Sequence, residues 1–497
     1  MSPARFPRLL AAETRLILRE RLTWAILAAL VVALCVGART GAVRVEAERA
    51  ALARAAQDEA RAVREAREAH LRYARPTPVT VNYWQDPTHA FGYMTQFLVS
   101  HAVKPPTPLA GLATGQSDVQ PGLIRVGFGF STVFDDTAYE PGAVAALRLG
   151  PFDLAFVLVA LVPLAVIALA GTRLAAEQDS GLLRLIAAQP VGPRAVAGAK
   201  FGAVALVTVA AVLGETALAL GLFGDLPPLA GWGATLALLA ASLAVYVGLW
   251  VALCALAVSL WRGAVAALAI LVLAWAGLTV AMPAALGLAA EALAPRPSRI
   301  AAIDASRQAQ ARFYAGDEAA RVAAAWLAAR APTAGDRPAL RDAPEIRRLA
   351  RDAYYDAALA ADRRAALDHA GAAAAWSRRL ALLSPASALG LALETAAGTD
   401  ATRHAAFLAA AAGHRRALRA FFEPRILAQA LDPVPVCAGC RARLDFDAYD
   451  AVPAFPARLD PGPGRRQALL ALAALLAAAL AATALAARCF AAWPVQR

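Results

Sequence analysis

Cys437 and Cys440, in the stretch CAGC, are the one close cysteine pair in the chain and its first candidate for chemistry. A C-x-x-C pair can be a redox dithiol, half of a zinc site or a structural disulfide. A zinc site needs two further ligands, and the available histidines, His404 and His414, stand ten residues apart with no other cysteine nearby. The surrounding DPVPVCAGCRARLD has the composition of a loop. A structural disulfide is the preferred interpretation, while free thiols, a metal site and redox chemistry stay open.

Glu215 is an ionisable residue inside one of the most apolar stretches of the chain. A carboxylate in hydrocarbon is costly and is by default a functional candidate, for example as the proton site of a secondary carrier. Such carriers commonly show several polar sites on interrupted helices, whereas here only Thr216 is a near neighbour. A structural hydrogen bond across a helix interface is the preferred role of Glu215.

The stretch NYWQDPTHAFGY contains Tyr83, Asp86 and His89, whose side chains resemble those of an acid/base group. Their place beside a proline favours turn formation and aromatic packing instead. The chain also lacks a nucleophile elbow and an H-E-x-x-H pair, so no hydrolase signature is present. We expect a protein that is not an enzyme and that has no catalytic residue, metal or cofactor of its own.

The composition indicates a membrane protein with substantial parts in water. Of the 497 residues, 59% are hydrophobic, yet 17% are charged, which is too many for a chain buried wholly in lipid. The net charge of +12 does not indicate nucleic-acid binding, because no basic run is interleaved with aromatic residues. The five cysteines are scattered, which excludes a disulfide scaffold.

Six apolar stretches have about the length that a helix needs to cross a bilayer core roughly 30 Å thick. The first is short and follows arginines, so a cleaved secretory signal is its alternative. The sequence therefore predicts a mainly α-helical, polytopic membrane protein with six transmembrane helices, at Leu22 to Ala38, Leu154 to Gly171, Phe201 to Phe223, Thr235 to Val258, Gly263 to Val280 and Ala468 to Ala487.

Residues 6–21 predict an amphipathic helix ahead of the first span. Leucine and isoleucine lie along one side and Arg8, Arg15 and Arg19 along the other, a pattern typical of a helix on the cytoplasmic lipid surface. Glu13 falls in the middle of the apolar side, where an unpaired carboxylate is unfavourable. We expect it to meet a partner group from another cytoplasmic segment, the alternative being a side chain that extends to the lipid headgroups.

Arginine and lysine in the short loops set the expected orientation. They gather before the first span and after the second, fourth and sixth, positions that share one side if six spans alternate. Both termini are therefore predicted to be cytoplasmic, and the remaining mass lies on the far side in two insertions, 40–152 and 281–467. The basic residues used are Arg5, Arg8, Arg15, Arg19, Arg21, Arg173, Arg184, Arg194, Lys200, Arg262 and Arg488.

The two insertions predict one helix-rich extracytoplasmic domain. Val43 to Arg75 is rich in Ala, Arg and Glu without Gly or Pro, which predicts a helix of about 50 Å continuing the first span. Residues 76–93 and 122–134 are consistent with short strands or ordered loops. The second insertion predicts a thin, alanine-rich core packed on the first insertion, with helices near Ala301 to Arg330, Ala343 to Leu383 and Ala401 to Ala430.

The loop between the second and third spans, EQDSGLLRLIAAQPVGPRAVAGAK, has a regular pattern. An apolar ridge of leucine and isoleucine follows Gly181 and ends at Pro190, and Pro193 favours the start of a new helix through Lys200 into the third span. An exposed apolar ridge on the cytoplasmic side indicates a protein partner, the alternative being a helix that only touches lipid.

This loop resembles the coupling segment of type-2 ABC exporter permeases, with the pattern E-x-x-x-G-x-L-x-x-L-x-x-x-P followed here by Gly198 and Lys200. The lead-in LLAAETRLILRERLTW resembles their N-terminal connecting helix, including Glu13 and Arg19. The stretches AGLATGQSDVQP, GPFDLAFVLVALVPL, APRPSR and LLSPASAL, in this order, are similar to the subgroup with a large extracytoplasmic domain of unknown function. Leucine at 182 departs from the threonine that the family often has. The resemblance implies that the ATPase-coupling residues are Glu177, Gly181, Leu182, Leu183, Leu185, Ile186 and Pro190.

The resemblance implies the permease subunit of an ABC exporter in a bacterial cytoplasmic membrane, with a substrate path between two permease chains gated by spans two and five. Its partners would be an ATP-binding subunit, a second permease chain, identical or different, and the lipid bilayer. ATP and magnesium would bind the ATP-binding subunit, and the absence of a G-x-x-x-x-G-K-[ST] loop from this chain agrees with that division.

The implied segment order places a connecting helix at 1–21 and a coupling segment at 172–200. Two other functions stay open: a proton-coupled secondary carrier that uses Glu215, and a membrane-anchored extracytoplasmic sensor or assembly protein. The spans take 22–39, 153–171, 201–223, 235–258, 263–280 and 468–487, and the insertions 40–152 and 281–467.

Overall fold

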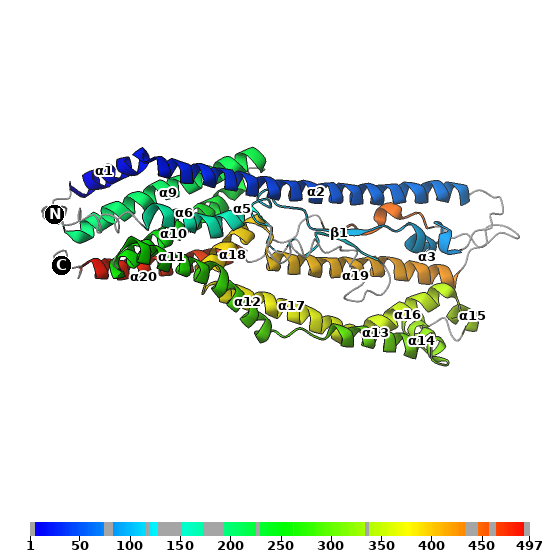
Figure 1. Cartoon of the computed structure of the whole chain (residues 1–497). Helices are drawn as coiled ribbons and strands as arrows, with labels where there is room; N and C mark the ends of the chain where they lie inside the picture. The colour runs from blue at the N-terminus through cyan, green and yellow to red at the C-terminus, as the bar shows by residue number, and fades with distance from the viewer. Residues whose placement is uncertain are drawn as a thin grey trace.

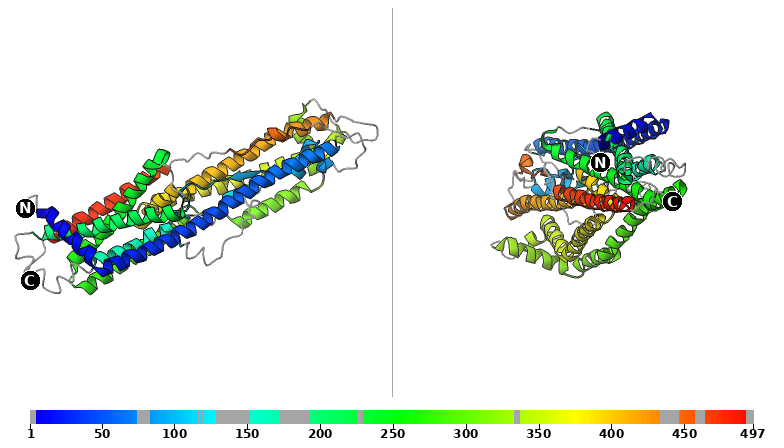
Figure 2. Two further views of the ribbon diagram at one scale, coloured as in Figure 1. Left: turned by 90° about the horizontal axis from the view of Figure 1, so that it is seen from above. Right: turned by 90° about the vertical axis from the view of Figure 1, so that its left-hand side faces the viewer.

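The computed structural model describes residues 5–73, 83–115, 117, 120–127, 152–171, 192–224, 229–261, 263–332, 337–432, 446–456 and 464–491. Within these ranges the chain is mainly helical and elongated (Figure 1). Apolar helices gather at the end where both termini lie, and we call this part the membrane bundle (Figures 1 and 2). The opposite end, the distal body, consists of the far half of the longest helix and residues 83–103, 120–127, 299–332, 337–381, 401–432 and 446–456.

The predicted amphipathic helix is α1 (Arg5–Arg19), and α2 (Arg21–Tyr73) follows it directly. With 53 residues, α2 is about 80 Å long at 1.5 Å per residue. It begins in the membrane bundle and runs along the distal body (Figure 1). Because Ala, Arg and Glu favour helix, the polar half continues the apolar half without a break. The prediction that a helix after Val43 extends the first span is confirmed.

Five helices are long and apolar enough to cross a membrane by length and composition. Five of the six predicted spans lie in them. The remaining predicted span, Leu154 to Gly171, is a shorter apolar helix, Leu154–Ala170, so the number six stays a prediction. The long helices are the apolar part of α2, α9 (Pro193–Phe223), α10 (Leu229–Leu260), α11 with α12 (Ala264–Leu293) and α20 (Gly464–Ala491).

One predicted helix boundary agrees with the structure and another differs from it. α9 begins at Pro193. The N–H groups in the first turn of a helix have no acceptor within the helix, so a proline there loses no hydrogen bond. The apolar helix that starts at Ala264 continues past Val280 through a π-helical turn, Gly277–Ala281, into α12 (Met282–Leu293). The fifth apolar helix is therefore longer than the predicted span.

The short apolar helix is hydrogen-bonded to its neighbours close to its proline. It consists of α5 (Leu154–Phe156), a π-helical turn (Val157–Leu161) and α6 (Val162–Ala170). Pro163 has no N–H to give the Val159 carbonyl, and the Tyr246 hydroxyl of α10 donates to that oxygen at 2.7 Å. The Trp275 Nε1–H donates to the next carbonyl, that of Ala160, at 2.8 Å. Buried Tyr246 thus ties this helix to the bundle core.

The three predicted helical stretches of the second insertion are present; the first two are divided, and the third is one continuous helix. The stretch to Arg330 breaks around Gly316, whose φ of 53° lies in the left-handed region that favours glycine. The next one breaks at Leu359. The distal helices are α13 (Arg299–Phe313), α14 (Glu318–Arg330), α15 (Pro338–Arg341), α16 (Pro344–Ala358), α17 (Ala360–Ala381) and α19 (Ala401–Leu431), with α18 (Pro385–Ala397) packed against α10 and α20.

The core of the distal body combines alanines with a cluster of large aromatic rings, so it is less thin than expected. Tyr93, in the π-helical turn Tyr93–Phe97, has its ring centroid 4.7 Å from that of Tyr449 and 5.3 Å from that of Phe446. Buried Phe407 and Phe422 of α19 belong to the same cluster. The large rings come both from helices and from the segments between them, and the cluster joins both insertions, as predicted.

Short strands are few in the described part of the first insertion. β1 (His101–Val103) pairs antiparallel with β2 (Leu123–Arg125), with Ala102 opposite Ile124. The strand expected in 122–134 is thus present at its start. Residues 83–97 instead form η1 (Tyr83–Gln85), α3 (Ala90–Gly92) and the π-helical turn, so the alternative of ordered local structure holds there.

Candidate functional site

The candidate site is the end of the membrane bundle where α1, the start of α9 and the end of α20 meet (Figure 1). The predicted coupling residues Glu177, Gly181, Leu182, Leu183, Leu185, Ile186 and Pro190 lie outside the described residues, as do Cys437 and Cys440. Of the predicted coupling segment, 172–200, residues 192–200 are described, and Gly171 at the end of α6 precedes it. The site is therefore built from the helices that flank this segment.

Glu13 of α1 and Lys200 of α9 form an ion pair across the site. Glu13 Oε1 lies 2.8 Å from Lys200 Nζ, and the side chains are only 19% and 10% exposed. The prediction that Glu13 meets a partner from another segment is confirmed. Arg19, the other predicted residue of the connecting helix, is exposed at the end of α1.

Small residues on α9 let α1 approach it closely. A Cβ at Gly202 would lie 3.3 Å from Leu10 Cδ1, and one at Gly198 would lie 3.6 Å from the ring of Phe6. The glycine contacts and the Glu13–Lys200 ion pair both fall within residues 198–202, so about one turn of α9 carries these contacts with α1. These contacts position α1 on α9, whose first residues belong to the predicted coupling segment.

The end of α20 closes the other side of the site. Arg194 Nε, in the first turn of α9, donates to the Ala487 carbonyl at 3.2 Å. The rings of Phe201 and Phe490 lie 6.3 Å apart. A movement of the first turns of α9 would therefore reach both α1 and α20.

The ion pair should behave as a coupled unit. We expect Glu13→Gln and Lys200→Met each to lower the stability of the protein in nanodiscs by about 2 kcal/mol, because each removes a largely buried ion pair. The double variant should lose much less than the sum. Thermal unfolding of the four proteins measures the coupling; additive losses would show that the pair contributes nothing specific.

Glu215 lies in α9, partly buried, with Thr216 buried beside it. Glu215 Oε2 and Thr216 Oγ1 find no hydrogen-bond partner among the described residues. The role of Glu215 that the sequence favours is a hydrogen bond across a helix interface. Among the described residues, Oε2 makes no such bond.

Asp86 and His89, considered as part of an acid/base group in the first insertion, instead stabilise local turns, which is the interpretation that the sequence favours. Asp86 Oδ1 accepts hydrogen bonds from the Thr88 backbone N–H at 2.9 Å and hydroxyl at 2.7 Å. His89 caps α3, with Nδ1 accepting from the Phe91 N–H at 3.1 Å. The side chain of Tyr83 lies outside the described residues.

The two histidines weighed as zinc ligands have separate partners. His414 Nε2 lies 2.8 Å from the Ser100 hydroxyl, and His404 Nδ1 lies 3.4 Å from Lys104 Nζ. In the described ranges, no group of three or more His, Cys, Asp or Glu side chains could hold a metal ion.

Sequence reasoning missed a polar cluster around Lys104, between the distal body and the membrane bundle. Lys104 is 5% exposed, and burial lowers its pKa to about 8. Burial, together with the charge of Lys104, lowers the pKa of His404 to about 4, so this histidine is neutral at pH 7. The sequence held one signal for this cluster, because Lys104 and Lys200 are its only lysines. The structure shows that both are buried.

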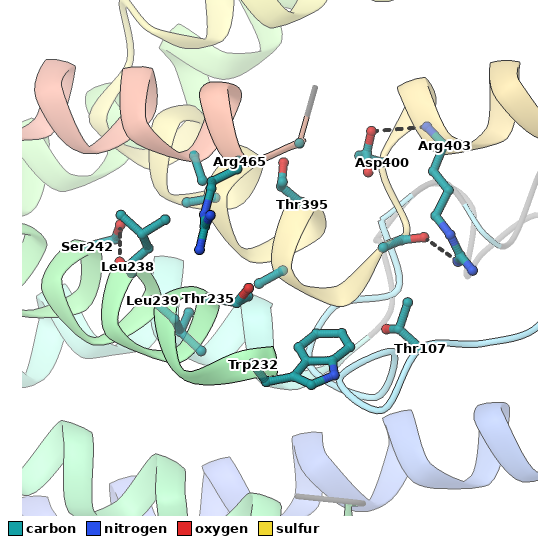
Figure 3. A pocket seen from close by; sticks show the side chains of 15 residues that line it. Thr107, Trp232, Thr235, Leu238, Leu239, Ser242, Thr395, Asp400, Arg403 and Arg465 are labelled. Atoms are coloured by element: carbon teal, nitrogen blue, oxygen red, sulfur yellow. Dashed lines mark hydrogen bonds between the residues drawn. The ribbon is translucent and has the colours of Figure 1, made fainter. Parts of the chain in front are cut away.

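A cavity of about 250 Å³ lies beside this cluster, between α10, α18 and the start of α20 (Figure 3). Trp232 and Leu239 form its apolar side, and Thr395, Arg403 and Arg465 its polar side. Arg403 Nη1 donates to the Gly398 carbonyl at 2.9 Å, which holds the guanidinium at the turn between α18 and α19. The cavity thus borders both the apolar helices and the distal body.

Residues 302–431, roughly a quarter of the chain, match a family described as a domain of unknown function, DUF3526. This stretch runs from α13 to the end of α19, so it covers helices of the distal body and none of the five long apolar helices. No curated protein and no solved structure matches the chain.

Proposed function

We propose that this chain is the permease subunit of an ATP-driven ABC exporter in a bacterial cytoplasmic membrane. A separate ATP-binding subunit hydrolyses ATP, and a second permease chain completes the translocation path. The five long apolar helices support a multi-pass membrane protein. The coupling pattern at Glu177 to Pro190 supports the ABC exporter class.

The observation that carries the proposal is the ion pair between Glu13 and Lys200. It attaches the amphipathic helix α1 to α9, whose first residues belong to the predicted coupling segment. A force applied to that segment by a moving ATPase would pass directly into α9 and, through Arg194 and Ala487, into α20.

The position of the two ends supports six crossings and a common side for both termini. The start of α1 and the end of α20 lie at the same end of the membrane bundle (Figure 1). A chain whose ends share a side crosses the membrane an even number of times. The short helix Leu154–Ala170, added to the five long helices, gives that even number.

The second candidate function is a proton-coupled secondary carrier, favoured by Glu215, whose Oε2 has no hydrogen-bond partner among the described residues. A carboxylate without such a bond is a possible proton site. Against this function stands the fact that Glu215 is the one carboxylate in the interior of the six predicted spans, whereas proton relays in membranes are built from several polar groups.

Co-purification tests the proposal. We expect the tagged full chain, extracted from native membranes in mild detergent, to retain a protein with a G-x-x-x-x-G-K-[ST] loop, identified by mass spectrometry, and ATPase activity. The ATPase activity should persist in Glu215→Gln. Preparations without any ATP-binding protein, combined with pH-gradient-driven transport that Glu215→Gln abolishes, would establish the carrier instead.

A further inference from the structure

An open cavity of about 500 Å³ lies in the distal body, away from the membrane bundle. Residues 84–95 form one wall, and the end of α13 and the start of α16 form the other. The two insertions meet here, so the cavity exists only in the folded tertiary structure. Its volume is that of a small-molecule site.

The aromatic side chains around this cavity are unusual for the distal body. Phe91 and Phe313, each 4% exposed, form its floor, while Trp84 is 42% exposed and Tyr314 is 66% exposed. Among the described side chains of the distal body, Trp84 and Tyr314 are the only aromatic ones more than a third exposed, and both line the same cavity. Exposed rings at a concave surface favour stacking with a flat ligand.

The opposite wall carries three arginines of α16, Arg347, Arg348 and Arg351, against one carboxylate, Asp342, whose Oδ1 lies 3.7 Å from Arg341 Nε. Arg348 Nε lies 3.5 Å from Asp352 Oδ2, and Arg351 Nη2 lies 3.2 Å from Asp352 Oδ1. The Asp352 side chain is 1% exposed, so this carboxylate holds both guanidinium groups against the helix without entering the cavity mouth.

Arg347 carries the third guanidinium group of this wall. It is exposed and makes no ion pair with any described residue. Arg348 faces Asp352 through Nε, which leaves its Nη groups for another acceptor. Paired guanidinium N–H groups match the two oxygens of a carboxylate or phosphate group.

We propose that this cavity binds a small organic anion with a flat aromatic body, its carboxylate or phosphate group on Arg347 and Arg348 and its ring system between Trp84 and Tyr314. The site is independent of the proposed ATPase coupling, because it lies at the other end of the molecule from α1 and the start of α9 (Figures 1 and 2).

Calorimetric titration of the full chain in nanodiscs tests the site, with empty nanodiscs as blank. The probes are 2-naphthoate, 2-naphthyl phosphate and the neutral 2-naphthalenemethanol. We expect both anions to bind at least about tenfold more tightly than the alcohol, and the tighter anion identifies the preferred group. Arg347→Gln should weaken both anions about tenfold and leave the alcohol unchanged. Trp84→Leu should weaken all three severalfold.

Arg307→Gln is the matched control, since Arg307 is exposed on α13 and does not line the cavity. It should change every affinity less than twofold. The absence of binding above the blank, equal affinity for the alcohol and the anions, or an equal loss in Arg307→Gln and Arg347→Gln would each overturn the proposal. Unaltered thermal unfolding of Arg347→Gln shows that the variant is folded.

Discussion

Replacing Leu183 and Ile186 together by aspartate should abolish co-purification of the ATP-binding subunit and leave membrane insertion intact. These residues form the apolar ridge of the predicted coupling segment. Two carboxylates placed in an apolar groove of the partner would lose their hydration without gaining a counterion, at a cost of several kcal/mol. Each 1.4 kcal/mol is a factor of ten in affinity, so the complex should weaken at least about a thousandfold.

A matched control separates lost coupling from damage to the protein. Leu367 in α17 and Ile303 in α13 are 56% and 40% exposed in the distal body. Their joint replacement by aspartate makes the same chemical change away from the candidate site and should leave association unaffected. Association that survives Leu183→Asp with Ile186→Asp would refute the coupling role, and association lost in both double variants would point to general misfolding.

Gly41→Ala should destabilise the protein by about 3 kcal/mol, at the upper end of the usual cost of overpacking. A Cβ at Gly41 of α2 would lie 2.1 Å from the Gly111 carbonyl oxygen and 3.0 Å from the Gly111 Cα. Both contacts are to backbone, so a side-chain rotation cannot relieve them. The loop that contains buried Leu109 and Leu112 would have to leave α2, and the hydrogen bond from Arg44 to the Ala110 carbonyl, 2.5 Å, would lengthen.

Gly371→Ala on α17 is the control with the opposite expected sign. A Cβ there would meet no heavy atom within 4 Å, and Gly371 is exposed. Alanine in an exposed helix interior is favoured over glycine by about 0.5–1 kcal/mol. Thermal unfolding in nanodiscs should therefore show a lower midpoint for Gly41→Ala and a slightly higher one for Gly371→Ala. Equal midpoints for Gly41→Ala and the parent protein would show that α2 does not need this close approach.

The distal body is held together by charges that the sequence does not reveal as partners. Asp356 of α16 receives Arg363 Nη1 at 2.8 Å and Arg415 Nη2 at 2.6 Å, and Arg419 contacts its other oxygen. These arginines come from α17 and α19. One carboxylate shared by three guanidinium groups joins three helices. In the linear sequence each of these residues only adds to the general arginine content.

Much of the helical framework could be predicted from the sequence because its causes are local. Hydropathy over about 20 residues identifies an apolar helix regardless of its neighbours, and the five long helices agree with that pattern. Pro193 marks the start of α9 through its own geometry. The long helix after Val43 follows from the propensities of Ala, Arg and Glu.

The sequence by itself determined which stretches form apolar and polar helices, and that Glu13 needs a partner. Only the tertiary structure decided that the partner is Lys200, 187 residues away. It likewise brought Tyr93 against Phe446 in an aromatic core and Trp84 opposite Arg347 across a cavity. Helical periodicity and propensity act over a few residues, whereas these contacts depend on which helices pack side by side, and that choice is made by the whole chain.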